Sequence, residues 1–115
     1  MVTVTSKNEK NRYEWEIKGH AGFKPGNDIV CAAVSAITYT LVQMLLNMQE
    51  RNAFGELDYR LEDGYASVKA IVRPTHMQEM NTVTETILGG YMLLESEYPD
   101  HVTLDFGVGE AKKKK

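Results

Sequence analysis

Cysteine is scarce in this chain, with a single residue, Cys31, among 115. One cysteine excludes an internal disulfide, so the thiol is free or pairs between molecules, and a reducing cytoplasm fits it best. The sequence also lacks any run that approaches the roughly 18 apolar residues of a membrane span. Its N-terminal segment lacks the basic and apolar regions of a signal sequence. We therefore expect a cytoplasmic protein with no export signal and no membrane anchor.

An excess of positive charge is missing as well. The net charge of -3 gives no general attraction to nucleic acid, so no direct nucleic-acid partner is expected. The one strongly basic run, at 112–115, is typical of a solvated tail, although a ribosome-binding arm stays an alternative. With 43% hydrophobic and 25% charged residues the remainder has an average globular composition. We expect one soluble domain over 1–110 and a disordered lysine-rich tail over 111–115.

Hydrophobic periodicity gives the order of elements. Alternation of apolar and polar residues predicts strands near 2–5, 13–18, 57–62, 66–72 and 102–106. Asp63-Gly64 lies between two of them and is a strong signal for a two-residue hairpin turn. Apolar spacings of three and four predict helices over 28–51 and 75–98. The order ββαββαβ predicts an α+β fold with a mainly antiparallel sheet and both helices packed on one face.

The helix ends carry their own signals. Asn27 or Asp28 is a good N-cap for the first helix, because either side chain accepts hydrogen bonds from free amides. Thr75 with Gln78 has the form of a capping box for the second. The pair at 89–90, Gly-Gly, weakens that helix, and we favour close contact with the first helix over a hinge as its explanation.

A thiol and an imidazole come together in the sequence near 19–35. Cys31 falls in the first turn of the first helix, where free amides and the helix macrodipole favour the thiolate. His20 ends a strand eleven positions earlier and could act as its base. Asp28, Cys31, Ser35 and Thr38 follow helical spacing and form one polar stripe. Asp28 could either cap the helix or hold the histidine.

Each of these residues also has an ordinary structural interpretation. A lone cysteine on an alanine-rich helix is often a small buried residue, Asp28 could be a plain N-cap, and Ser35 could bond its own helix. His20 could be a strand-end histidine with a satisfied hydrogen bond. A metal site would draw on His20, Cys31 and the histidines at 76 and 101, but paired ligand spacing is missing. No metal or cofactor is expected.

The string Gly19-His20-Ala21-Gly22, a short loop, and then Gly26-Asn27-Asp28-Ile29-Val30-Cys31-Ala32-Ala33-Val34-Ser35-Ala36 resembles the signature of the bacterial ribosomal-processing cysteine proteases, the Prp family. The length and the ββαββαβ order fit that family too. Its members are homodimeric cytoplasmic endopeptidases that remove an N-terminal extension from the large-subunit ribosomal protein numbered twenty-seven.

The resemblance implies roles for particular residues. Cys31 would be the nucleophile, His20 the general base and acid, and Asp28 and Ser35 supporting residues of the site. The loop that would cover the substrate contains Gly22, Phe23, Lys24, Pro25, Gly26 and Asn27. This loop is slightly shorter than is usual in the family, and the lysine tail is not part of the family pattern.

The resulting hypothesis is a dimeric cysteine endopeptidase whose substrate is a ribosomal protein precursor. The alternative is a non-catalytic dimeric domain that binds an extended peptide or a ribosomal partner in the same groove. A thiol redox sensor ranks lower, because a second cysteine to resolve a sulfenic acid is missing from the sequence.

Overall fold

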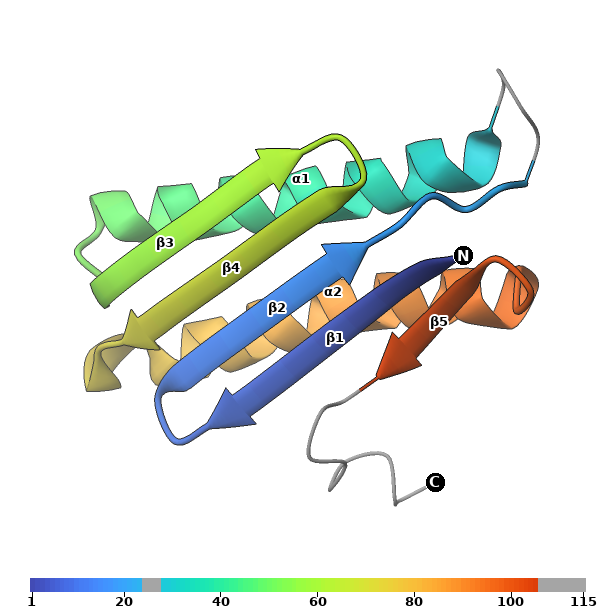
Figure 1. Cartoon of the computed structure of the whole chain (residues 1–115). Coiled ribbons are helices and arrows are strands. Elements are labelled where there is room, and N and C mark those ends of the chain that lie inside the picture. The colour runs from blue at the N-terminus through green and yellow to red at the C-terminus, as the bar shows by residue number, and fades with distance from the viewer. Residues whose placement is uncertain (24–27, 106–115) are drawn as a thin grey trace.

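The computed structural model describes residues 1–23 and 28–105. Within them the chain forms one five-stranded sheet with two long helices, in the predicted ββαββαβ order (Figure 1). The elements are β1 (Val2–Glu9), β2 (Arg12–Lys18), α1 (Ile29–Glu50), β3 (Phe54–Glu62), β4 (Tyr65–Val72), the short 3-10 helix η1 (Pro74–His76), α2 (Met77–Glu97) and β5 (Val102–Asp105). The prediction of an α+β fold is confirmed.

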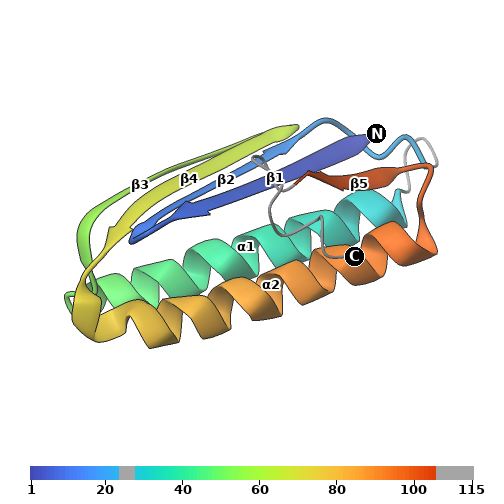
Figure 2. The ribbon, with the colours of Figure 1, turned by 90° about the horizontal axis from the view of Figure 1, so that it is seen from below.

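The strands lie in the spatial order β3-β4-β2-β1-β5. Among the strands of the described residues, three of the four pairings are antiparallel, and only β1 with β5 is parallel. Both helices cover the same face of this sheet (Figure 2), as predicted. Because β2 pairs with β4, the end of β2 lies beside the turn that joins β3 to β4. This adjacency positions the site described below.

The sheet face under the helices carries the alternating apolar residues. Tyr13, Trp15 and Ile17 of β2 are all buried, whereas Glu14 and Glu16 between them are only half-buried. The same alternation holds along β4. Burial of one face of each strand follows from the period of two in strand side chains and fixes the register of the sheet.

Helix α1 packs its apolar stripe on this face, with buried side chains at Val30, Val34, Thr38, Leu41, Val42, Leu45 and Met48. By length and composition alone α1 could cross a membrane. The expectation that no run in the sequence approaches the length and hydrophobicity of a membrane span is therefore wrong. A core helix of a soluble protein has the same properties, and packing of α1 against the sheet accounts for its composition.

The two helices approach closely at Gly90. A Cβ there would lie 3.1 Å from Cδ1 of Ile37, so the contact interpretation of this glycine is confirmed; the same position at Gly89 meets open space. Nearby, Thr38 donates its hydroxyl to the Val34 carbonyl (2.8 Å) and accepts from the buried Tyr91 hydroxyl (2.7 Å). Burial raises the pKa of Tyr91 to about 12.

The start of the second helix differs from the prediction. The prediction of a capping box is wrong. Helix α2 begins at Met77 after η1, and its N-cap residue, His76, makes no side-chain capping bond. Thr75 instead bonds its hydroxyl to Nδ1 of His76 at 3.0 Å. Pro74 favours a helical first turn through its fixed φ, and here that turn is a tight 3-10 turn. Phe106 and the lysine tail lie outside the described residues.

Candidate active site

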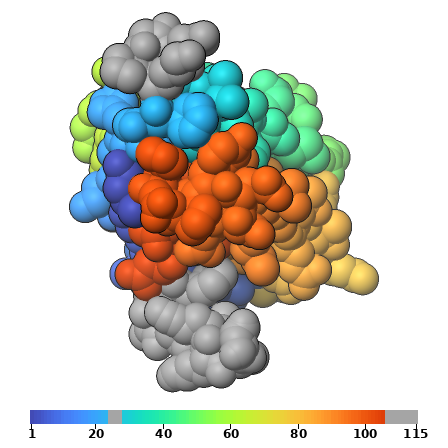
Figure 3. All heavy atoms as spheres, turned by 90° about the vertical axis from the view of Figure 1, so that its right-hand side faces the viewer, coloured from blue at the N-terminus to red at the C-terminus, as the bar shows by residue number. Residues whose placement is uncertain are grey.

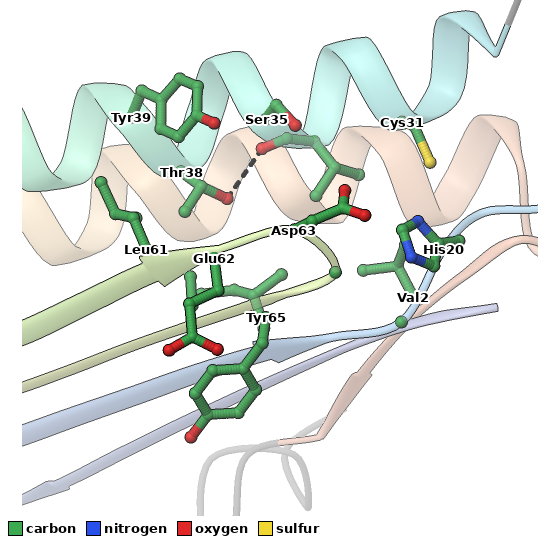
Figure 4. Close-up of a pocket in the computed structure, with 15 residues that line it drawn as sticks. Val2, His20, Cys31, Ser35, Thr38, Tyr39, Leu61, Glu62, Asp63 and Tyr65 are labelled. Carbon is green, nitrogen blue, oxygen red and sulfur yellow. Dashed lines mark hydrogen bonds between the residues drawn. The ribbon is translucent and has the colours of Figure 1, made fainter.

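Three of the expected site residues line one cavity at the end of the sheet where β2 leads toward α1, and Asp28 lies outside that lining. A cavity of about 120 Å³ lies between the first half of α1 and the β3–β4 hairpin. His20, Cys31 and Ser35 all line it, together with Thr38 and Asp63. Figure 4 shows Cys31 projecting from α1 and His20 from the end of β2 into this space. The structure therefore brings together a thiol, an imidazole and a hydroxyl.

Asp28 caps α1 and also holds the approaching chain. Its Oδ1 accepts from the Cys31 amide at 2.8 Å, and its Oδ2 accepts from the Phe23 amide at 3.0 Å. The bond from the Cys31 amide is the main cause that holds the pKa of Asp28 below its ordinary value. Of the two roles left open for Asp28, the structure shows the helix cap.

Replacing Asp28 with alanine is expected to lower the Tm by a few degrees at neutral pH, because the first turn loses its acceptor. The folded-state pKa is lowered, so the carboxylate stabilises the fold above its unfolded pKa of about 3.9 and loses this effect as the pH falls through the lowered value. The Tm difference should shrink there, because a protonated Asp28 still accepts hydrogen bonds but has lost its charge. Asp28→Asn, which caps without charge, should retain most stability at neutral pH. A Tm difference that is constant with pH would contradict this.

The Cys31 thiol is a free, half-buried group at the amino end of a 22-residue helix. Its Sγ accepts a hydrogen bond from the backbone amide of Ala21 at 3.1 Å. An amide donor and the positive end of the helix macrodipole favour a negative charge on sulfur, whereas the Asp28 carboxylate, which interacts with the Cys31 side chain, opposes it. The surroundings of Cys31 therefore differ from those of a small core residue and suit a nucleophile.

His20 is exposed, and its ring packs against the turn between β3 and β4. A Cβ at Gly64 would lie only 2.7 Å from Nε2 of His20, and Gly64 has a φ of +74°. The Gly19 amide donates to the Gly64 carbonyl at 2.9 Å, which ties the end of β2 to this turn. Only glycine leaves room for the ring at this place.

Several residues of the cavity were missed by the sequence reading. Asp63 was interpreted only as half of a hairpin turn, yet it lines the same cavity as His20. Tyr39 of α1 and Leu61 of β3 extend the wall and are partly exposed apolar side chains. Their only sequence signal was their place on an amphipathic element, which many core residues share.

Part of the expected substrate loop can be placed. Gly22 has a φ of +67°, and Phe23 packs its ring against Tyr98 and His101. Lys24, Pro25, Gly26 and Asn27 lie outside the described residues. Among residues 1–23 and 28–105, no three side chains of the His, Cys, Asp or Glu type gather in a way that could hold a metal ion.

Known proteins match this chain over most of its length. The sequence pattern of the family described as cysteine protease Prp matches residues 1–103. The ribosomal processing cysteine protease Prp of Staphylococcus aureus is 24% identical over 106 residues, which are 91% of this chain and 96% of that protein.

Solved structures share the fold. A crystal structure of the S. aureus protease Prp with a covalently linked product peptide has a TM-score of 0.74 at 24% identity, covering 92% of this chain and 99% of the other. A crystal structure of a Streptococcus mutans protein has a TM-score of 0.68 at 28% identity, with coverage of 92% and 93%.

Proposed function

The chain belongs to the cysteine protease Prp family, a family of thiol peptidases for ribosomal processing, and we propose that it removes the N-terminal extension of the large-subunit ribosomal protein numbered twenty-seven. Cys31 serves as the nucleophile and His20 as the general base and acid. The observation that carries this proposal is the position of the Cys31 sulfur at the start of α1. This sulfur accepts a hydrogen bond from the Ala21 amide and lies in the same cavity as His20.

In the proposed reaction His20 takes the proton of the Cys31 thiol, and the thiolate attacks the carbonyl carbon of the scissile peptide bond. The tetrahedral intermediate collapses to a thioester, and the imidazolium gives its proton to the leaving amine. His20 then takes a proton from water, whose oxygen attacks the thioester. The acid product leaves, and Cys31 regains its proton.

Two amides at the start of α1 are already engaged and are not free to stabilise the oxyanion of the tetrahedral intermediate. The Cys31 amide already donates to Oδ1 of Asp28, and the Ala32 amide donates to the Asp28 carbonyl at 3.1 Å. The Ala21 amide instead points at the sulfur itself. We assign the Ala21 amide as a hydrogen-bond donor to the oxyanion, because an amide that contacts Sγ lies close to the carbonyl group that Sγ attacks.

The cavity suits a peptide that lies along α1. Beyond Cys31 its wall continues past Ser35 and Thr38 to Tyr39, with Leu61 and Glu62 of β3 on the opposite side. The S. aureus protease Prp has been crystallised with a substrate peptide and with a covalently linked product peptide. In the proposed function this chain binds its precursor in the same manner, acts in the cytoplasm and forms a homodimer.

Intact-mass analysis tests the proposal directly. The protein is incubated with the ribosomal protein that carries its N-terminal extension, and in parallel with the same protein lacking it. We expect the first substrate to lose the mass of the extension and the second to keep its mass. If neither mass changes while the precursor still binds, the protein is a peptide-binding domain and the proposed peptidase activity is wrong.

A further inference from the structure

The short segment 20–23, which precedes α1, is fixed from its inner side by the start of that helix. The Ala21 amide donates to Sγ of Cys31 at 3.1 Å, and the Phe23 amide donates to Asp28 at 3.0 Å. Ala21 itself is only 2% exposed. The segment therefore lies directly over the thiol, and its position decides where the Ala21 amide points.

The same segment is held from its outer side by the turn between α2 and β5. Nδ1 of His101 lies 2.9 Å from the Ala21 carbonyl oxygen, 80 positions away in the sequence. A carbonyl only accepts, so Nδ1 carries the proton of this bond. The Phe23 ring stands edge-on to the rings of Tyr98 and His101, with centroids 5.5 Å and 5.3 Å away. Figure 3 shows the atoms of this turn, in orange, packed against the light-blue segment.

His101 is itself a rigid support. Its backbone amide donates to the Tyr98 carbonyl at 2.9 Å, and its carbonyl accepts from the Val2 amide at 2.8 Å. These bonds join the end of α2 to the start of β1. The His101 imidazole therefore projects from a fixed backbone, unlike a side chain on a free loop.

We propose that His101 is a positioning residue for the thiol site, which holds the Ala21 carbonyl so that the amide of the same residue stays directed at Cys31 Sγ. The part of this role that concerns peptide cleavage rests on the proposed function. The N–H and C=O of one residue are engaged on opposite sides, by sulfur and by imidazole. Loss of the bond from His101 frees Ala21 to turn, and a displacement of about 1 Å at a reacting centre can lower the reaction rate about a hundredfold.

Alkylation of Cys31 in the free enzyme, measured against pH, tests this role without any substrate. We expect His101→Ala to slow alkylation at neutral pH by about three- to tenfold and to move its pH midpoint upward, because the thiolate loses a hydrogen-bond donor. His101→Asn should restore both, because its side-chain amide supplies a donor close to the position of Nδ1. The other titratable groups that face the thiol stay in every variant: Asp28, which interacts with the Cys31 side chain, and His20, Glu62 and Asp63 around the cavity.

His76→Ala is the matched control, since that histidine bonds Thr75 at the start of α2 and lies at the other end of the helix. It should alkylate like the wild type. An unchanged alkylation profile in His101→Ala would overturn the proposal. If His101→Ala does not fold, His101→Phe takes its place, because it keeps a ring beside Phe23 but has no donor for the Ala21 carbonyl, and it should slow alkylation in the same way; a wild-type rate there would overturn the proposal as well.

Precursor cleavage adds a second readout. If the proposed function holds, His101→Ala should lower kcat and leave KM nearly unchanged, as expected for a residue that positions the nucleophile. If the wild type does not cleave the precursor, the proposed function fails, while the alkylation comparison still decides the role of His101.

Discussion

Replacing Cys31 with alanine is expected to abolish cleavage of the ribosomal precursor, with a loss of roughly a millionfold in kcat, which reaches the detection limit of most assays. The loss is this large because the covalent route disappears completely, and His20 then has no thiol to activate. The fold should be retained, because a half-buried thiol is exchanged for a smaller apolar group on a helix. Intact-mass analysis of the precursor measures the result.

Two further variants make this prediction specific. Cys31→Ser keeps the shape of the side chain but supplies a much weaker nucleophile, so its rate should also fall severely. Ser35→Ala removes the Ser35 hydroxyl from the same cavity but leaves the Cys31 thiol in place. It should retain most of the activity, as expected for a supporting residue. Cleavage by Cys31→Ala at the wild-type rate would show that the thiol is not the nucleophile.

Replacing Gly64 with alanine is expected to lower kcat at least about a hundredfold, through displacement of His20. The added Cβ would lie 2.7 Å from Nε2 of the imidazole, so the ring must leave its place. The positive φ of +74° adds a backbone cost of about 1–2 kcal/mol, because alanine rarely adopts this conformation. Cleavage kinetics and the free energy of unfolding are measured together to separate the two effects.

Asn52→Ala provides the matched control for the backbone effect. Asn52 has a φ of +59° and lies in the turn between α1 and β3, outside the residues that line the cavity. This variant should lose a similar amount of stability and keep the wild-type kcat. If Gly64→Ala also kept its kcat, the position of His20 would not depend on the hairpin turn.

The sequence was sufficient to predict the strands and helices and part of the candidate active site. Alternation and helical spacing are local properties of the chain, so they predicted the strands and helices correctly, and the residue types at 27–28 limited the N-cap to Asn27 or Asp28. The capping box failed because Thr75 and Gln78 compete with the conformation that follows Pro74, and η1 formed there instead. A local pattern has no information on which of two local structures the surrounding packing favours.

The rest of the site depends on contacts between distant segments. The Asp63-Gly64 turn reaches His20 only because β4 pairs with β2, and that pairing follows from the sheet as a whole. The bond from His101 to Ala21 likewise joins residues 80 positions apart. By spacing alone Cys31 was more consistent with a buried structural residue than with a nucleophile. The amide that donates to its sulfur belongs to Ala21, in a neighbouring segment. The spacing of residues in the sequence cannot predict that this segment passes over the thiol.

The parallel pairing of β1 with β5 has a consequence for biosynthesis. β1 is the first strand to be made and β5 the last, and the Val2 amide bonds His101 just before β5 begins. Pairings of such long sequence separation form late in folding, after the intervening chain is available. If His101 supports the thiol site as proposed, a nascent chain cannot complete that site until its final strand has left the ribosome. The site would then form only once β5, the last of the described elements to be made, is available to pair with β1.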